Sequence, residues 1–361
     1  MNTRSRDRQL ASWHIRIVRP GAIVVFLTAV VSYASAANRS VCPSGCTYST
    51  IQSAINAASA GDTIVIGKGR YLETLVVLGK RLTLQGADSR TTVIDANGAG
   101  TVVTIGDFNT PSNTPVALSN LTITRGFGSN GGGIAVLNGG SLTLRHSVVV
   151  GNHSSGDGGG INVFSDSAVT IADSTITNND ATLAGGGIAA TGESTTFQIL
   201  RSTVSANRSS QGFGGGIALT YDGSKLTLQN TDIVDNSASS SGGAFLGGGV
   251  PADTLTVQDV SVTGNVASGD TGGLWVAAPA TLGRVVVAHN SAATSGGGLT
   301  TAAAFRGGGV ITFGDVYVVQ NKAGTHGGGI FNNASLTISA AVIADNQPDN
   351  CVQSATGTGC P

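Results

Sequence analysis

Residues 131–152 read GGGIAVLNGGSLTLRHSVVVGN, and the chain repeats this pattern as GGGINVFSDSAVTIADSTITNN at 158–179 and GGGIAATGESTTFQILRSTVSAN at 185–207. Three features recur in each copy: a glycine triplet closed by an isoleucine, an apolar-polar-apolar triad, and an asparagine three residues after Val or Ile. A repeat of this length is typical of solenoid proteins, in which each unit buries its apolar face only against its neighbours.

Two columns of equivalent residues carry the repeat along most of the chain. Successive members of each column lie 25 to 31 residues apart. The residues that close the glycine motif are Ile134, Ile161, Ile188, Ile217, Phe245, Leu274, Leu299 and Ile330. The asparagines are Asn152, Asn179, Asn207, Asn236, Asn265, Asn290, Asn321 and Asn346. We predict that these asparagines form a turn ladder, because Asn tolerates left-handed turns and its amide can bond to the next Asn.

The triad between the two columns alternates apolar and polar residues. In the first copy above it is Leu142-Thr143-Leu144, and nearly every later copy also has Thr in the polar position. Such alternation predicts a strand with one buried and one solvated face. Each repeat then supplies about three short strands, with no helix-length segment between them. The sequence therefore predicts an all-β fold, a single-stranded right-handed parallel β-helix (solenoid) of about ten coils with about 28 residues each.

The position six residues before each asparagine carries mainly charged residues. Asp173 and Arg201 occupy it in adjacent repeats, and Asp259, Arg284 and Asp315 occupy it further along the chain. Neighbouring coils of a parallel sheet lie ~4.8 Å apart. These charges should therefore pair in exposed rungs along a solvated corner, Asp173 with Arg201 and Arg284 with both of its neighbours.

The N-terminal segment has the features of an export signal. Residues 1–36 contain five arginines ahead of an apolar run at 21–31, and they end on the small residues Ala34-Ser35-Ala36. The β-helix is then assigned to residues 37–361, in which no segment could span a membrane. This organisation predicts a secreted or cell-surface protein of a bacterial envelope, and a monomer.

Both ends of the predicted β-helix carry segments that would cover an open sheet edge. Residues 49–58 have one apolar helical face, and Ser49 with Gln52 matches a capping box, so we predict a short N-terminal cap helix there. Residues 347–361 follow the last asparagine and form the predicted C-terminal cap.

Cysteine placement and charge narrow the classes of partner. The four cysteines lie at the two ends, which favours local disulfides Cys42–Cys46 and Cys351–Cys360 over a single metal site. Residues 37–361 hold 14 Lys or Arg and 19 Asp or Glu, so the sequence lacks the basic stripe of a nucleic-acid-binding protein. The histidines show no ligand spacing, and we expect no metal ion or cofactor.

A few aromatic residues suggest a binding surface. In the strand after one glycine motif Leu274 and Val276 should point inward, so that Trp275 points outward. The same offset places Phe331 outward two coils later, and Tyr221 follows the equivalent strand two coils earlier. Such a stripe could stack on sugar rings, although isolated exposed aromatic residues are also common on protein surfaces.

Two stretches resemble known families. The segment from Ile51 to Gly86, with Gly61-Asp62-Thr63-Ile64 and Leu82-Thr83-Leu84-Gln85-Gly86, resembles the opening of pectin-lyase-like β-helices, which implies a fold that many activities share. The GGGI and Val/Ile-x-x-Asn motifs between Gly131 and Asn346 are similar to the repeats of polymorphic outer membrane proteins. That resemblance implies a surface-displayed or secreted passenger module with a role in adhesion.

The repeats contain no recognisable catalytic constellation. Asn178-Asn179-Asp180 and His326-Gly327 look hydrolase-like, but both fall on the repeat columns. We therefore predict a secreted or cell-surface β-helix module with a structural, adhesive or carbohydrate-contact role, whose partner is a polysaccharide or a cell-surface glycan. The alternative is an enzyme, a polysaccharide lyase or glycoside hydrolase of the pectin-lyase-like fold with a divergent site, which would need clustered carboxylates.

Overall fold

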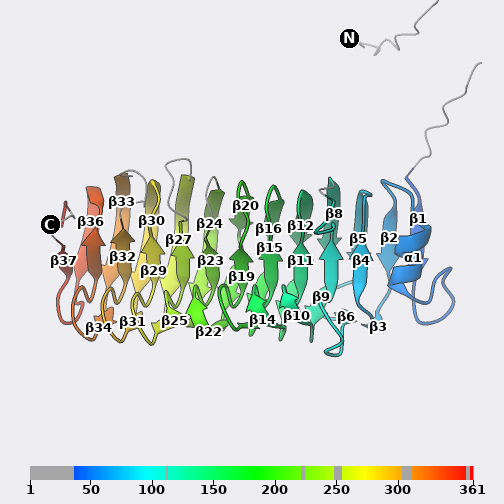
Figure 1. Cartoon of the computed structure of the whole chain (residues 1–361), viewed down its shortest axis with the longest axis horizontal. Helices are drawn as coiled ribbons and strands as arrows, with labels where there is room; N and C mark the ends of the chain where they lie inside the picture. Colours follow the sequence, from blue (N-terminus) through cyan, green and yellow to red (C-terminus); the bar gives the residue numbers. More distant parts are fainter. Residues whose placement is uncertain are drawn as a thin grey trace, which may run out of the picture. The chain divides into compact units, whose positions relative to one another are not determined.

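The computed structural model describes residues 36–110, 113–220, 224–247, 254–302, 310–354 and 358–360. In these ranges one helix and 37 strands alternate with tight turns, and the strands pair in parallel with strands of the adjacent coil. Figure 1 shows the coils following one another in chain order, from α1 at one end to β37 at the other. The predicted right-handed parallel β-helix is confirmed, whereas the predicted export signal falls almost entirely outside the described residues.

The strands that follow the eight glycine motifs belong to a sheet of eleven strands, which also contains β4, β7 and β37, so the structure has about eleven coils against about ten predicted. They are β4 (Leu75–Val77), β7 (Val103–Ile105), β11 (Ile134–Val136), β15 (Ile161–Val163), β19 (Ile188–Ala190), β23 (Ile217–Leu219), β26 (Ala244–Leu246), β29 (Leu274–Val276), β32 (Leu299–Ala302), β35 (Ile330–Asn333) and β37 (Cys351–Gln353). Ile134 pairs in register with Ile161 and Ile161 with Ile188, so the motif isoleucines stack in the core.

One register assignment from the sequence is wrong. Ala244, and not Phe245, pairs with Ile217 and is fully buried. Phe245 instead lies on the outer face, where it pairs with Trp275. The reason is that Ser241 adopts the left-handed φ (54°) that the first glycine of the motif adopts in most other coils. The motif in this coil therefore begins with a serine, one residue before its first glycine.

The triads and the strands before the asparagines belong to one sheet of 18 strands, which turns at the charged corner. They are β1 (Asn38–Val41), β2 (Thr63–Ile66), β3 (Gly69–Leu72), β5 (Leu82–Gly86), β6 (Thr92–Asp95), β8 (Thr114–Ser119), β9 (Thr122–Thr124), β12 (Gly140–Arg145), β13 (Val148–Val150), β16 (Ala168–Ala172), β17 (Thr175–Thr177), β20 (Thr196–Leu200), β21 (Thr203–Ser205), β24 (Lys225–Val234), β27 (Thr254–Thr263), β30 (Ala280–Ala288), β33 (Val310–Val319) and β36 (Ser335–Ala344). Corner residues such as Asp173 (φ 51°) and Arg201 (φ 45°) are left-handed, which redirects the chain without ending the sheet.

The residues after the asparagines, together with Phe127–Asn130 in the coil before the first of them, form a third sheet, of eight strands, along the lower edge of the view in Figure 1. They are β10 (Phe127–Asn130), β14 (His153–Asp157), β18 (Asp180–Ala181), β22 (Arg208–Phe213), β25 (Ser237–Ser240), β28 (Val266–Ala267), β31 (Ser291–Ala292) and β34 (Lys322–Ala323). The sequence prediction contains no such sheet. Strands as short as Asp180–Ala181, with one small buried residue each, leave no alternating pattern to recognise.

The N-terminal end of the core is covered by α1 (Ile51–Ala57), which is shorter than the predicted 49–58. Its N-cap residue is Thr50, so the predicted capping box at Ser49 is wrong. The Glu73 carboxylate supplies the missing acceptors, because it accepts hydrogen bonds of 2.8 and 2.9 Å from the first two N–H groups of the helix. A carboxylate from a distant part of the chain thus caps the N-terminus of the helix, where the sequence pattern suggested capping by a side chain of the helix itself.

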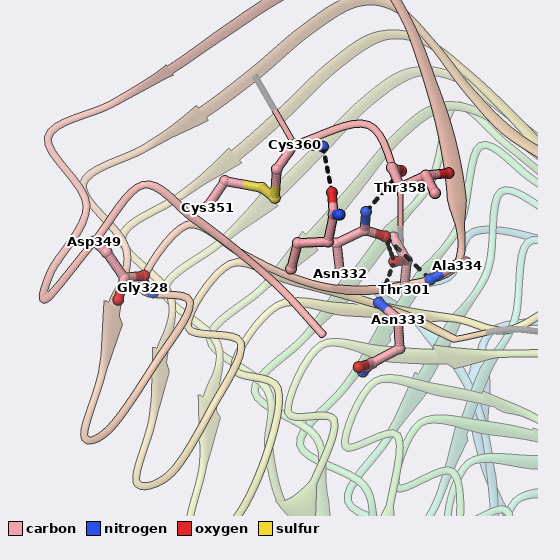
Figure 2. The surroundings of a disulfide bond; sticks show 10 residues. Thr301, Gly328, Asn332, Asn333, Ala334, Asp349, Cys351, Thr358 and Cys360 are labelled. Carbon is pink, nitrogen blue, oxygen red and sulfur yellow. Dashed lines mark hydrogen bonds between the residues drawn. A yellow bond between two sulfur atoms is a disulfide. The ribbon is translucent and has the colours of Figure 1, made fainter. Parts of the chain in front are cut away.

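The C-terminal cap is a partial coil closed by a disulfide between Cys351 and Cys360 (Figure 2). Its strand β37 pairs with β35, and Asn332 Nδ2 donates to Thr358 O at 2.9 Å. At the other end of the solenoid Cys42 is bonded to Cys46, four residues away. Both disulfides therefore close short local loops, as expected.

One apolar core, mostly aliphatic, fills the interior of the described coils, from Val41 at the N-terminal end to Leu336 near the C-terminal end. No helix in the described ranges is long and apolar enough to cross a membrane. Function therefore has to be sought on the outer faces and corners, where polar side chains stand on a rigid scaffold of stacked coils.

Candidate functional site

The ladder asparagines are buried and bonded to one another along one edge of the β-helix. Asn207 is typical: its side-chain Nδ2 and its backbone N both donate to Asn236 Oδ1 at 3.0 Å. The ladder starts where Gly126 N donates to Asn152 Oδ1, and it ends on Asn350 Oδ1. Because these amides are satisfied within the protein, the column stabilises the fold and offers little to a ligand.

The left-handed turn expected at the asparagines lies one residue earlier. Asn178, before Asn179, has a φ of 53°, and Asp235, before Asn236, has a φ of 54°. The preceding residue makes the corner, so that each ladder asparagine begins the next segment and directs its amide along the solenoid axis. The expectation that the ladder asparagines are themselves left-handed is therefore wrong.

Trp275 points outward and stacks on other aromatic rings of this protein, on the outer face of the sheet. Trp275 lies over Phe245, with ring centroids 4.0 Å apart and ring planes 5° apart. Phe245 also contacts Phe213, at a centroid distance of 4.4 Å. Since these rings face one another, at least one π-face of Trp275 is used within the protein and is not available to a sugar.

The other two aromatic candidates do not extend this stack. In the register of the eleven-stranded sheet, Thr300 stands between Trp275 and Phe331. Tyr221 lies outside the described residues. A continuous aromatic platform through all three candidates is therefore not formed by the described part of the sheet.

Two of the three charged rungs predicted at the corner are present. Arg201 donates to both carboxylate oxygens of Asp173, at 2.8 and 2.9 Å, and Arg284 donates to both oxygens of Asp259, at 2.5 and 2.8 Å. These hydrogen bonds lower the pKa of both carboxyl groups. The charge of Asp315 also acts on Arg284, but among the described residues no ion pair within 4 Å joins the two, so the third rung is not closed.

A fully buried carboxylate lies at the N-terminal end of the same sheet. Arg70 and Arg125 both donate to Asp95, which has no exposed surface. Burial alone would raise the pKa of Asp95, but the hydrogen bonds from Arg125, from the Asn97 N–H and from Arg70 lower it below its ordinary value. The cluster therefore joins three coils, and its carboxylate is not free to act on a substrate.

Asp62 plays a similar structural part beside the cap helix. Its carboxylate accepts hydrogen bonds from the backbone N–H groups of Ala37 and Ser59, at 2.8 and 2.9 Å, and from Arg39 Nε at 2.7 Å. These three donors, with Ala37 first, lower the pKa of Asp62 to about 2. Asp62 thus ties the first strand to the turn that follows the helix.

A different column of polar and aromatic side chains lies on the outer face of the eight-stranded sheet. Its members start the eight strands and pair in register from one coil to the next. They are Phe127, His153, Asp180, Arg208, Ser237, Val266, Ser291 and Lys322. Adjacent members stand ~4.8 Å apart along the axis. We call this set the outer column.

The first four members of the outer column contact one another. The Phe127 ring stacks on His153, with centroids 5.0 Å apart and planes 22° apart. His153 Nδ1 lies 2.8 Å from Asp180 Oδ2, and Arg208 donates to Asp180 Oδ1 at 3.4 Å. The side chains of His153, Asp180 and Arg208 are 38%, 35% and 61% exposed. They are therefore held in place and still accessible to a ligand.

The outer column runs into an open groove of about 210 Å³. The groove is lined by Arg208, Ser209, Ser210, Ser237, Ala238, Ser239, Val266 and Ser268. Val266 is 50% exposed and is surrounded by serine side chains from three coils. Hydroxyl groups around an exposed aliphatic side chain suit a ligand that presents both hydroxyls and C–H faces, as a sugar ring does.

The sequence contains the signal for this column, but only the register of the coils reveals it. His153, Asp180 and Arg208 each follow a ladder asparagine directly. Considered one at a time they look like turn residues, and more than 25 residues separate each from the next. Stacking brings them within hydrogen-bonding distance, which no local motif indicates.

Metal ligation has no candidate in the part of the chain that the structure describes. There, no group of three or more His, Cys, Asp or Glu side chains is arranged to hold a metal ion. The carboxylates of Asp95, Asp173 and Asp259 are instead occupied by arginines. The expectation that the protein uses no metal or cofactor stays a prediction.

The match to a known family agrees with this architecture. The family model described as "Right handed beta helix region" matches residues 92–292, more than half of the chain. A solved structure of the pectin methylesterase from Aspergillus niger aligns at 15% sequence identity and a TM-score of 0.40, over 89% of this chain and 91% of that one. No curated protein matches the sequence. On the family match, the chain belongs to the family of right-handed β-helix region proteins.

Proposed function

We propose that this protein is an extracellular β-helix module that contacts a polysaccharide or cell-surface glycan through the eight-stranded sheet. Residues 1–36 are then the export signal of a bacterial envelope protein, and residues 37–361 are the mature monomeric β-helix. The groove beside Arg208 is the single observation that carries the proposal, because it combines an accessible cation, hydroxyl groups and an exposed aliphatic side chain.

The scaffold suits a polymeric ligand better than a small one. Equivalent positions recur ~4.8 Å apart along the axis, so an extended chain of sugars can contact several coils at once. Phe127 at one end of the outer column is 53% exposed and offers an apolar surface to a sugar ring. The disulfides at both ends are compatible with an oxidising, extracellular location.

Retention of the exported, purified protein on a panel of immobilised polysaccharides tests the proposal. Arg208→Ala should weaken retention roughly fivefold or more, since it removes the cation at the groove. Arg201→Ala is the matched control, because Arg201 lies in the same coil, is also paired with an aspartate and faces another sheet. Trp275→Ala tests the aromatic candidate separately, and unchanged retention means that Trp275 is not used.

Failure of the protein to bind any polysaccharide in the panel, or equal losses for Arg208→Ala and Arg201→Ala, would contradict the proposal. The first result would exclude polysaccharides as the ligand. The second would show that the groove is no more important than any other charged site on the surface.

A polysaccharide lyase or hydrolase is the second candidate function, and one observation favours it. Asp180 holds His153 Nδ1 at 2.8 Å, an arrangement that orients an imidazole for proton transfer through its other nitrogen. The same panel should therefore be read for shortened or unsaturated products. If products form, His153→Gln should abolish them, whereas His289→Gln, in a turn of a later coil, should not.

A further inference from the structure

The two halves of the outer column differ in charge. In the N-terminal half the Asp180 carboxylate stands between the imidazole of His153 and the guanidinium of Arg208. In the C-terminal half the column passes from Arg208 to Lys322 without a carboxylate, through Ser237, Val266 and Ser291. This C-terminal half is called the cationic trough below.

Arg208 keeps most of its hydrogen-bonding capacity free. It reaches Asp180 through one nitrogen only, at 3.4 Å, whereas Arg201 in the same coil uses two nitrogens on Asp173 at 2.8 and 2.9 Å. The Arg208 side chain is 61% exposed. Lys322, at the other end of the trough, is exposed and makes no ion pair within the described residues. Both cations can therefore take an external anion.

The position of these cations contrasts with the charge of the protein. Residues 37–361 carry five more acidic than basic residues, so the molecule as a whole repels polyanions. Two exposed carboxylates, Asp235 and Asp270, lie in the turns on either side of the trough. Asp270 is bound by Thr294 Oγ1 and by the Ser295 N–H. The turns thus disfavour an anion, and the trough between them favours it.

The spacing of the two cations points to a polymer. Four coil steps separate Arg208 from Lys322, which corresponds to ~19 Å along the axis. The exposed Val266 and the serines of the groove lie between them. A single small anion could engage only one end, whereas a chain lying along the axis could present acidic groups to both and sugar surfaces to the residues between.

We propose that the cationic trough binds an anionic polysaccharide, which lies parallel to the solenoid axis with acidic groups near Arg208 and Lys322. This inference rests on the proposed polysaccharide contact and specifies its ligand class. Carboxylate, sulfate and phosphate groups share the chemistry that the two cations recognise, and the test below separates the first two from a neutral chain.

Affinity electrophoresis of the exported protein in gels that contain dextran, carboxymethyl-dextran or dextran sulfate provides the test. The three probes share one backbone and differ in their acidic groups. The charged dextrans should retard the protein, and neutral dextran should retard it at least about fivefold less. The double variant Arg208→Ala/Lys322→Ala should lose roughly tenfold in affinity for the charged probes, as expected for two partly exposed charge contacts.

The control double variant is Arg201→Ala/Lys225→Ala, which changes the net charge by the same amount on the 18-stranded sheet. It should stay within about twofold of the unmodified protein, because surface charges distant from the ligand are screened at physiological salt. Equal loss in both double variants, or equal or absent retardation in all three gels, overturns the inference. If neutral polysaccharides of the earlier panel still bind through the groove, the proposed function survives and only the anionic class fails.

Discussion

Replacement of Asn236 by alanine tests the ladder where it is fully buried. The Asn236 amide donates to Val204 O at 2.9 Å and to Asn265 Oδ1 at 3.0 Å. Its Oδ1 accepts from the backbone N and the Nδ2 of Asn207, both at 3.0 Å. The variant loses these four hydrogen bonds and leaves the Asn207 N–H buried without its acceptor. At about 1 kcal/mol for each bond the four bonds account for about 4 kcal/mol, and the unpaired buried donor adds about 1–3 kcal/mol, so the total loss is about 5–7 kcal/mol.

Equilibrium unfolding in guanidinium chloride, followed by far-ultraviolet circular dichroism, measures this loss. The denaturant concentration at the midpoint should fall, while the dependence of the free energy of unfolding on denaturant concentration should stay the same. Ser237→Ala, at the next residue on the exposed side, is the control and should change stability by less than about 0.5 kcal/mol. A loss below about 1 kcal/mol for Asn236→Ala would refute the reasoning, because it would mean that the buried amides are not coupled from coil to coil.

Three further predictions concern the same scaffold. The pKa of Asp62 is about 2 in the folded protein, below its value of about 3.9 in the unfolded chain. Asp62 therefore contributes its full share to the stability of the fold above pH ~4, and this contribution is lost as the pH falls toward 2. Asp62→Asn should flatten that part of an acid-unfolding curve. Loss of the disulfide between Cys351 and Cys360, which lie nine positions apart, should cost about 2–3 kcal/mol, seen as a lower melting temperature of the double serine variant. Gly215→Ala should destabilise strongly in calorimetry, because its Cβ would lie 2.3 Å from a backbone oxygen, whereas Gly314→Ala, whose nearest neighbour is 3.6 Å away, should be tolerated.

The repeat made the architecture predictable because the columns that stack in the core are chemically uniform. Ile134, Ile161 and Ile188 are identical residues at almost equal spacing, and a solenoid must place them in one row. The prediction failed where a single substitution shifts the register. Ser241 replaces the leading glycine of its motif, and Phe245 was assigned to the core in place of Ala244.

The candidate site was less predictable for a physical reason. A buried column must be uniform to pack, but the outer column faces solvent and changes from Phe127 through Asp180 to Lys322 without any recurring chemistry. Whether the outer column can bind a ligand depends on which side chains become neighbours, and the neighbours follow from the register of the coils alone. The corner pair Asp173–Arg201 could be predicted because opposite charges in adjacent repeats are visible in the sequence.

Hydroxyl-radical footprinting of the protein with and without a retained polysaccharide tests the location of the contact most directly. The proposal predicts that oxidation falls at Phe127, His153 and Val266, which stand along the outer column, while Tyr317 on the far sheet reacts as before. Protection at Tyr317 or at Trp275, with an unchanged outer column, would place the ligand on another face and contradict the account.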